Sequence, residues 1–359
     1  MTLEEIISQI EPPDAAAAEK AQQRLDRLTK PQGSLGRLEV LARWLASVTR
    51  TFPLSIERPV VFTFAADHGV AAEGVSAYPQ EVTAQMVLNF LAGGAAINAL
   101  AKQAGADVVV ADFGVAVDFK PTSGLIDAKI ARGTANMAVG PAMSREQALG
   151  AINEGARIAL ASKERGAGLF ALGEMGIGNS TAASALTAAL TGASPEEVTG
   201  RGTGVDADGL KKKIEVVRRA LVVNKLDPAD PISILAQVGG FEIAGLVGVV
   251  LAGAATRTPV IVDGFIASAA ALIACRIAPD AVHYLSASHM SVERGHQRLL
   301  RELGLTVLFD FGMRLGEGTG AALAIPILRA SCAVYNEMAT FPQAGVSERS
   351  GSQAEEVKS

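Results

Sequence analysis

Two glycine-rich segments of the 359-residue chain carry the side chains best suited to chemistry. The first, Gly173–Thr181, places Glu174 ahead of three polar side chains, Asn179, Ser180 and Thr181. Glycines let a ligand approach the backbone closely, and a helix that begins here would point free N–H groups at an anion. The segment suits a phosphate monoester, and a plain glycine-rich turn before a capped helix fits the local sequence equally well.

The second segment, Asp310–Ala321, holds Glu317 between Gly316 and Gly318. Glycine neighbours leave room for a ligand beside the carboxylate. Apolar surroundings would raise the pKa of this carboxyl toward neutrality, which a general base requires. The alternative is an ordinary acidic residue that is stabilised by the start of the following helix. The local sequence does not separate these two interpretations.

Other polar residues also follow apolar runs. The glycine-rich segment Gly200–Asp206 precedes Lys211–Lys213, each of which could neutralise a phosphate or lie on a solvated helix face. Asp263 could accept hydrogen bonds from ribose hydroxyls or cap the helix that follows it. Asp67 and His68 could bind a metal or relay protons, but no further His or Cys lies at ligand spacing. A structural role is favoured for this pair.

Short apolar runs precede most of these polar segments. Nearly continuous apolar strands that alternate with helices indicate a parallel sheet covered on both faces. Ligands of such sheets bind beyond the carboxyl ends of the strands, where the polar segments fall. We therefore expect an α/β fold with a doubly wound, mainly parallel six-stranded sheet and helices on both faces. The strands are expected at 60–64, 107–112, 168–172, 258–262, 282–285 and 305–309.

Helical patterns separate the strands and dominate both ends of the chain. Ser34 should cap a helix that runs to about Thr49, and Ser291 could cap the helix after the fifth strand. A helix is expected from Ala182 to Leu190, directly after the first glycine-rich segment. The polar segments are therefore expected at helix starts.

The terminal helices have no strand partners of their own. We expect residues 1–55 and 321–359 to form a small helical domain, and residues 56–320 to form the catalytic sheet domain. From Gln343 onward the composition of Ser, Glu, Gln and Gly predicts a frayed tail.

Composition and charge exclude several classes of protein. The net charge of −5 and the pI near 5.6 give nothing that attracts a polyanion, so no nucleic-acid partner is expected. The N-terminus lacks the features of a signal peptide. The longest apolar stretch, 232–256, contains Gln237, Glu242 and a Gly-Gly pair, so we expect two packed helices rather than a membrane span. Cys275 and Cys332 lack metal spacing and indicate reduced thiols in a cytoplasmic protein.

Together, segments along nearly the whole chain resemble one family, the nicotinate-nucleotide–dimethylbenzimidazole phosphoribosyltransferases of cobalamin nucleotide-loop assembly. Each segment alone is a weak signal, whereas the full set in this order, ending in Arg-Leu-Gly-Glu-Gly, is highly specific. The resemblance fades only in the first dozen residues and after about Phe341. The matching segments are Lys30–Glu39, Ala66–Val70, Tyr78–Thr83, Gly173–Thr181, Val238–Glu242, Asp263–Phe265, Ser288–Ser291 and Met313–Gly318.

The resemblance implies a pentosyl transfer. Family members move 5-phosphoribose from nicotinate mononucleotide to 5,6-dimethylbenzimidazole and release α-ribazole 5′-phosphate and nicotinate. The glutamate of Arg-Leu-Gly-Glu-Gly, here Glu317, takes a proton from one benzimidazole nitrogen while the other nitrogen attacks the ribose C1′ with inversion. Glu174 is implied as a secondary carboxylate near the reacting ribose. No metal or other cofactor is implied.

The resemblance also implies the substrate-binding residues. Asp263 and Ser291 should lie beside the nucleotide. Tyr78, Met86 and Leu315 should line the pocket for a benzimidazole-type base, whose identity stays open because the position of Tyr78 differs within the family. The phosphate should be held by Lys213 and the loop residues Gly176, Ile177, Gly178, Asn179, Ser180 and Thr181, with Gly202 also in the substrate site. We expect a homodimer without membrane partners.

Two functions of other classes provide alternatives. A dinucleotide-dependent oxidoreductase requires Gly-x-Gly-x-x-Gly after an early strand and an acidic residue about 20 residues later, and the sequence has neither. A non-catalytic nucleotide-binding protein on the same fold would leave Glu317 dispensable. The first alternative is disfavoured by its missing motif, and the second is separated from an enzyme by substitution of Glu317.

Overall fold

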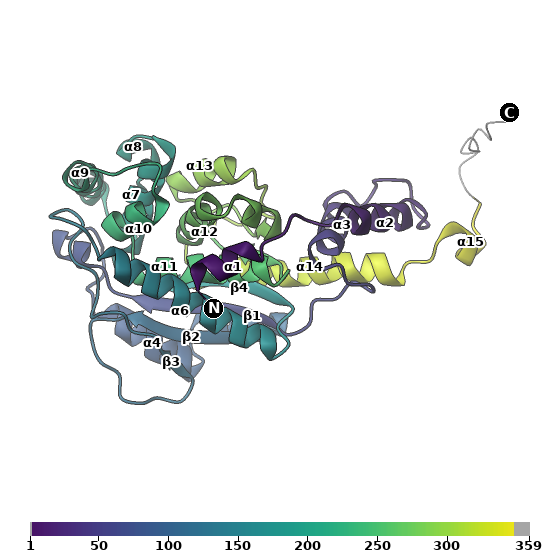
Figure 1. Ribbon diagram of the computed structural model, residues 1–359, viewed down its shortest axis with the longest axis horizontal. Helices are drawn as coiled ribbons and strands as arrows, with labels where there is room; N and C mark the ends of the chain where they lie inside the picture. The colour runs from purple at the N-terminus through teal and green to yellow at the C-terminus, as the bar shows by residue number, and fades with distance from the viewer. Residues whose placement is uncertain (1, 348–359) are drawn as a thin grey trace. The chain divides into compact units, whose positions relative to one another are not determined.

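The computed structural model describes residues 2–347, which form two compact units (Figure 1). The sheet unit consists of residues 2–12 and 57–325, and the helical unit consists of residues 13–56 and 326–347. Most of the tail expected to fray lies outside the described residues.

The division differs from the expected one at the N-terminus. Helix α1 (Leu3–Ser8) contacts α6 (Arg145–Glu164) and α11 (Phe241–Ala255) and buries Leu3 and Ile6. These apolar contacts assign the first residues to the sheet unit, although their sequence was expected to join the helical domain. That the two units are domains in the folding sense stays a prediction.

All six strands of the sheet are parallel, which confirms the expected fold class. Their order is β3-β2-β1-β4-β5-β6. The order reverses direction between β1 and β4, so the loops that leave these two strands diverge and open a crevice at their carboxyl ends. The strands are β1 (Pro59–Ala66), β2 (Asp107–Gly114), β3 (Leu125–Asp127), β4 (Leu169–Met175), β5 (Val260–Val262) and β6 (Leu285–Ala287).

One expected strand is wrong and one strand was missed. Residues 305–309, after α13 (Arg294–Leu303), form no strand. Phe309 makes an isolated bridge with His289, in the segment just beyond β6, and Leu308 and Phe309 also donate to the carbonyl oxygen of Ser288. The sixth strand is instead β3, which pairs with the end of β2. Its side chains are half-buried or exposed, so it lacks the apolar run by which the other strands were recognised.

Helices make up most of the remainder of the chain. The helical unit contains α2 (Ala15–Asp26), α3 (Arg37–Thr49) and α15 (Phe341–Ala344), and α14 (Thr319–Glu337) carries the chain from the sheet unit into it. The other helices of the sheet unit are α4 (Val82–Ala92), α5 (Ala96–Ala104), α7 (Asn179–Thr191), α8 (Pro195–Val198), α9 (Ala207–Asn224), α10 (Pro231–Val238) and α12 (Phe265–Ile277), with 3-10 helices at Gly69–Glu73 and Pro279–Tyr284.

Several helix starts differ from the expected caps. Helix α3 begins after Gly36 and has no side-chain cap, so Ser34 lies in the preceding turn. Helix α7 begins at Asn179 rather than at Ala182. The apolar stretch 232–256 does form two helices, α10 and α11, as expected.

The segment Val82–Ala104 is long and apolar enough to cross a membrane by composition alone. Gly93 and Gly94 divide it into the separate helices α4 and α5. Both helices contact strands of the sheet, which is the arrangement of helices that cover a sheet face. Only 28% of its apolar window is buried, so packing against the sheet accounts for one face of these helices and leaves apolar residues such as Leu88 exposed.

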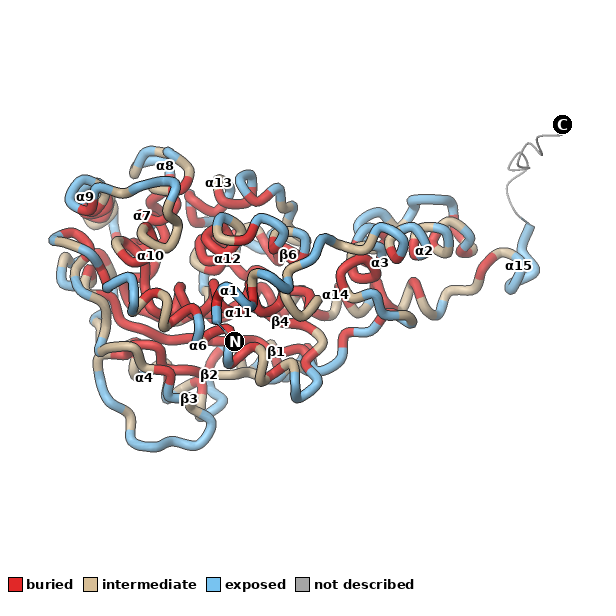
Figure 2. The backbone as a smooth tube through the Cα atoms, in the orientation of Figure 1, coloured by how far each residue is buried: buried red, intermediate tan, exposed pale blue. Residues whose placement is uncertain are grey.

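Helix α11 is the centre of the core. Figure 2 shows it buried together with β1 and β4, and it contacts β1, β2, β4 and β5 while α6 packs along it. The two helices approach closely at glycines. A methyl group on Gly155 would overlap the carbonyl oxygen of Gly245, and one on Gly248 would lie 2.6 Å from the backbone nitrogen of Ala156.

We expect Gly155→Ala to destabilise the protein by about 1–3 kcal/mol, because the added methyl meets backbone that cannot move aside. Gly150→Ala, on the same helix, is the matched control: its methyl would lie 3.8 Å from Ile130 Cδ1, an ordinary contact. This control should gain about 0.5–1 kcal/mol from higher helix propensity. Urea unfolding measures both, and equal stabilities of the two variants would contradict the close-packing argument.

Candidate active site

The candidate site lies at the carboxyl ends of β1 and β4, where the strand order reverses. Phe64 of β1 pairs with Glu174 of β4, so both strands end at the same level. The loop that contains Glu317 docks on this edge from the start of α14. The topology therefore brings together polar segments that are far apart in the sequence.

The backbone of Glu317 is fixed by two strands. Its carbonyl oxygen accepts a hydrogen bond from Thr63 Oγ1 at 3.0 Å, and its N–H donates to the carbonyl oxygen of Glu174 at 3.2 Å. Glu317 has a φ of 62°, between Gly316 at 86° and Gly318 at 90°. A left-handed conformation costs a non-glycine residue about 1–2 kcal/mol. The surrounding hydrogen bonds offset that cost and hold a side chain that glycine could not supply.

The side chain of Glu317 is 5% exposed. Its Oε2 atom accepts a hydrogen bond from the N–H of Ile97, in the first turn of α5, at 3.2 Å. Burial raises the pKa of the Glu317 carboxyl, and the Ile97 N–H partly opposes this by favouring the charged form. A carboxyl with a raised pKa that still ionises has the properties of a general base.

Glu174 is the more strongly perturbed carboxyl. Burial raises its pKa to about 8, with further increases from the negative charges of Glu242, Asp263 and Glu317. The Asn179 side-chain amide donates to Glu174 Oε2 and acts in the opposite direction. At neutral pH Glu174 is therefore mainly protonated and can donate a hydrogen bond, which an ionised carboxylate cannot.

Asp263 completes the group of three buried carboxyls. Its Oδ1 atom accepts the N–H of Ala321 at 2.9 Å, so it holds the start of α14. Burial raises its pKa to about 7 against hydrogen bonds from the backbone of Ala321, Gly320 and Gly318. It does not cap α12, whose N-cap is Gly264. The alternative of a simple cap on the helix after Asp263 is therefore wrong.

A second cluster gathers around Lys213. This lysine is fully buried, and its ammonium donates to Ser180 Oγ at 2.7 Å. Burial lowers its pKa to about 8, and the nearby Glu293 carboxylate acts against this shift. A methyl group on Gly202 would lie 2.6 Å from the ammonium nitrogen, so Gly202 also belongs to this cluster. Lys211, in contrast, pairs with Asp208 at the surface.

The loop Gly176–Gly178 leads into α7, so Asn179, Ser180 and Thr181 form the first turn of that helix. Gly178, with a φ of 100°, is its N-cap and supplies no side-chain cap. Thr83 Oγ1 of α4 accepts the N–H of Ile177 at 3.1 Å. Thr181 Oγ1 is buried without a hydrogen-bond partner. Most of this turn is buried and Ser180 is its half-exposed member, so an anion would reach the helix start at Ser180.

Ser291 is buried and its N–H donates to His296 Nδ1 at 2.9 Å. The sequence suggested Ser291 as a cap of α13, but the N-cap of that helix is Glu293. The Cβ atom of Ser291 lies 3.8 Å from the position that a methyl on Gly264 would take. Ser291 therefore lies beside the segment that contains Asp263.

The three residues expected around the acceptor base are less enclosed. Tyr78 is 56% exposed and Leu315 is 57% exposed. Met86 is half-buried on α4, three residues beyond the Thr83 that binds Ile177, and so lies on the same side of that helix. Their common pocket stays a prediction.

A family model described as phosphoribosyltransferase matches residues 10–346. The chain belongs to this phosphoribosyltransferase family. It is therefore an enzyme, and the dinucleotide-dependent oxidoreductase is not supported.

Named phosphoribosyltransferases are similar to the chain over nearly its full length. The nicotinate-nucleotide–dimethylbenzimidazole phosphoribosyltransferase of Geobacter metallireducens is 53% identical over 344 residues, which cover 96% of this chain and 98% of that protein. The enzyme of the same name from Desulforudis audaxviator is 54% identical over 346 residues, with the same shares. The crystal structure of CobT from Thermus thermophilus matches with a TM-score of 0.90 and 48% identity, covering 93% of this chain and 100% of that one.

Several residues that shape the candidate site were not expected from the sequence. Thr63 and Thr83 orient backbone groups, and Ile97 contributes only its N–H, which no side-chain pattern reveals. Glu293 accepts the N–H of Gly202 at 2.9 Å. A polar Thr63 between Phe62 and Phe64 in a fully buried strand was the one available signal.

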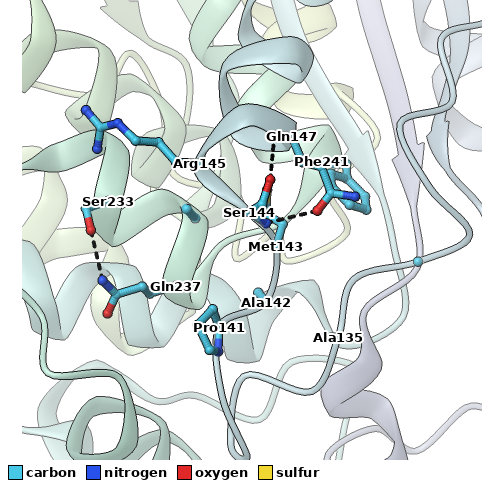
Figure 3. Close-up of a pocket in the computed structure, with 12 residues that line it drawn as sticks. Ala135, Pro141, Ala142, Met143, Ser144, Arg145, Gln147, Ser233, Gln237 and Phe241 are labelled. Atoms are coloured by element: carbon cyan, nitrogen blue, oxygen red, sulfur yellow. Dashed lines mark hydrogen bonds between the residues drawn. The ribbon is translucent and has the colours of Figure 1, made fainter.

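A cavity of about 640 Å³ lies elsewhere in the sheet unit. It is lined by Met143, Ser144 and Arg145 at the start of α6 and by Ser233 and Gln237 of α10 (Figure 3). None of the expected site residues lines it. This cavity therefore does not coincide with the residues of the candidate site.

The buried carboxyls predict a loss of stability as pH rises. Glu174 and Asp263 have folded-state pKa values of about 8 and about 7, well above those of unfolded chains. Their contribution is therefore full below about pH 4 and is lost as pH rises through these values. We expect Glu174→Gln to raise the melting temperature at about pH 8.5 and to change it little at about pH 4, as measured by calorimetry.

Glu73→Gln is the control with the opposite sign. Hydrogen bonds from Asn136 and Arg219 lower the pKa of Glu73, so its stabilising contribution is present above the unfolded pKa and lost at lower pH. That substitution should lower the melting temperature at about pH 8.5. A Glu174→Gln effect that does not grow with pH would contradict the proposed protonation of Glu174.

Proposed function

We propose that the enzyme transfers 5-phosphoribose from nicotinate mononucleotide to 5,6-dimethylbenzimidazole or a related base, with Glu317 as the general base. The products are α-ribazole 5′-phosphate and nicotinate. The observation that carries this proposal is the similarity, over 96% of the chain, to enzymes named for that reaction. The geometry of Glu317 supports its role.

In the proposed reaction, Glu317 accepts the proton from one nitrogen of the acceptor base. The electron pair of the other nitrogen forms the new bond to ribose C1′. The bond between C1′ and nicotinate breaks, and its electron pair neutralises the pyridinium nitrogen. Attack from the face opposite the leaving group inverts the β configuration to α.

The charges of the site suit this donor. The pyridinium ring of nicotinate mononucleotide and the electron-poor ribose that forms during transfer are both cationic, and buried carboxylates stabilise such a ribose strongly. Glu317 and Asp263 can supply this charge when ionised, and Glu174, which is mainly protonated at neutral pH, can donate a hydrogen bond. Lys213, Ser180 and the first turn of α7 can bind the dianionic phosphate. A cationic sugar and an anionic phosphate thus each have a partner of opposite charge.

We expect Glu317→Gln to lower kcat by about 10²–10⁴-fold, the usual contribution of a general base. Glu174→Gln should retain most activity, because an amide replaces a carboxyl that is already mainly protonated. Turnover with nicotinate mononucleotide and dimethylbenzimidazole measures both, and calorimetry should show that each variant still binds nucleotide. Wild-type turnover in Glu317→Gln would favour a non-catalytic role for this residue.

Lys213→Ala should weaken binding of nicotinate mononucleotide more than binding of dimethylbenzimidazole. The buried ammonium has no reason to contact an uncharged base, whereas it would pair with the phosphate. Titration calorimetry with each ligand separates the two effects. Lys211→Ala is the matched control, since Lys211 pairs with Asp208 at the surface. Equal weakening of both ligands by Lys213→Ala would refute the phosphate assignment.

We also infer a cytoplasmic homodimer from the family resemblance. Sedimentation of the purified protein tests the dimer. The alternative of a nucleotide-binding protein without activity predicts donor binding but no release of nicotinate, which the same assays detect.

A further inference from the structure

A buried pair of side chains lies behind the glycine loop of the site. His68 Nε2 and Glu242 Oε1 are 2.7 Å apart, and the two side chains are 1% and 0% exposed. His68 follows β1, and Glu242 is in the first turn of α11, where the helix dipole favours a carboxylate. The proposed transfer assigns neither residue a contact with substrate. Burying such a pair nevertheless carries a desolvation cost.

The pair lies against the glycine loop at Gly176 and Gly178. A methyl group on Gly176 would lie 3.3 Å from both Glu242 Oε1 and His68 Cδ2, and one on Gly178 would lie 3.1 Å from His68 Cβ. Thr83 holds the same loop through the N–H of Ile177. The loop therefore lies between α4 on one side and the buried pair with the end of β1 on the other, where a methyl group on Gly176 would overlap the carbonyl oxygen of Ala66.

A third glycine, Gly240, lies against the pair itself. A methyl group on Gly240 would overlap His68 Cε1 and would lie 2.6 Å from Glu242 Oε2. The Oε2 atom is buried without a hydrogen-bond partner. The side chain of Glu242 is therefore held by the hydrogen bond of its other oxygen to His68 and by contact with the two glycine segments.

The neighbouring Asp67 has a different role. Its Oδ2 atom accepts the N–H of Ala116 at 2.8 Å, and its carbonyl oxygen accepts the N–H of Thr134. These bonds tie β1 to the segments that follow β2 and β3. Asp67 therefore supports the outer part of the sheet, whereas His68 faces the glycine loop.

We propose that His68 and Glu242 are positioning residues of the phosphoribosyl transfer, because their hydrogen-bonded pair fixes the Gly176–Gly178 loop in the shape that receives the donor nucleotide. The inference rests on the proposed function and adds a support that touches no substrate. Loss of the pair lets the loop sink toward α11, which misplaces the first turn of α7 and the phosphate that binds there. The acceptor base, on the Glu317 side, is affected much less.

The test compares four variants for the Michaelis constants of nicotinate mononucleotide and dimethylbenzimidazole. Glu242→Leu keeps the side-chain volume but removes the bond to His68. It should lower kcat/KM for the donor by about 10–100-fold, the usual effect of misplacing a bound reactant, while the acceptor KM changes little. Glu242→Gln keeps an oxygen that can accept from His68 Nε2 and should restore most of the loss.

Gly240→Ala disturbs the pair from the side away from the loop and should reproduce the donor defect, even if Glu242→Leu folds poorly. Lys129→Met is the matched control, because it breaks a buried ion pair with Asp112, 2.8 Å long, at the end of β2. It should leave the ratio of the two Michaelis constants unchanged.

Equal changes in the constants of donor and acceptor for Gly240→Ala, or no rescue by Glu242→Gln, would overturn the positioning role. These outcomes are distinct from failure of the proposed function, which the wild-type protein would reveal by releasing no nicotinate. In that event, donor binding by calorimetry with the same variants still tests the inference, since a displaced loop must weaken nucleotide binding.

Discussion

The hydrogen bonds that hold the Glu317 peptide against β1 and β4 are the constraint on which the site depends. Thr63 binds its carbonyl oxygen, and the carbonyl of Glu174 binds its N–H. These bonds secure a left-handed glutamate that would otherwise relax, and they bring two carboxyl-bearing segments together across some 140 residues of sequence. The same contact requires Gly173, since a methyl group there would overlap the Glu317 carbonyl. The position of the catalytic candidate is therefore set by the sheet rather than by the loop alone.

This constraint brings several carboxyl groups close together, where their negative charges repel one another. Glu174, Asp263 and Glu317 cannot all ionise when buried beside one another, so their pKa values rise and separate. Burial raises the pKa of Glu317, the hydrogen bond from the Ile97 N–H opposes that rise, and no other carboxyl is among the causes of its shift. Two adjacent carboxyls can thus hold different protonation states, one suited to accept a proton and the other to donate a hydrogen bond.

Sequence patterns predicted the helices and strands that are determined by their own residues. The strand before Asp263 and the helix that follows it are confirmed, because a continuous apolar pattern determines both. The edge strand β3 was missed because its partners supply the pairing and its own residues carry no apolar run. At the site, Glu317 and Lys213 had recognisable chemistry, but the N–H of Ile97 and the bond between His68 and Glu242 depend on tertiary contacts. The family resemblance named residues, whereas the distances between them arise from the order of the strands.

The difference in burial between the carboxyls and the expected acceptor pocket has a consequence for specificity. Glu317 and Glu174 are almost fully buried and are held by strands, while Tyr78 and Leu315 are more than half exposed and are held by loops. On the proposed assignment, substitutions around the acceptor base would alter few core contacts and would leave the carboxyl group intact. Changes at the buried carboxyls would disturb hydrogen bonds to β1, α5 and α14 together. On that assignment the choice of acceptor can vary more freely than the carboxyls that activate it, because the two sets of residues differ in burial.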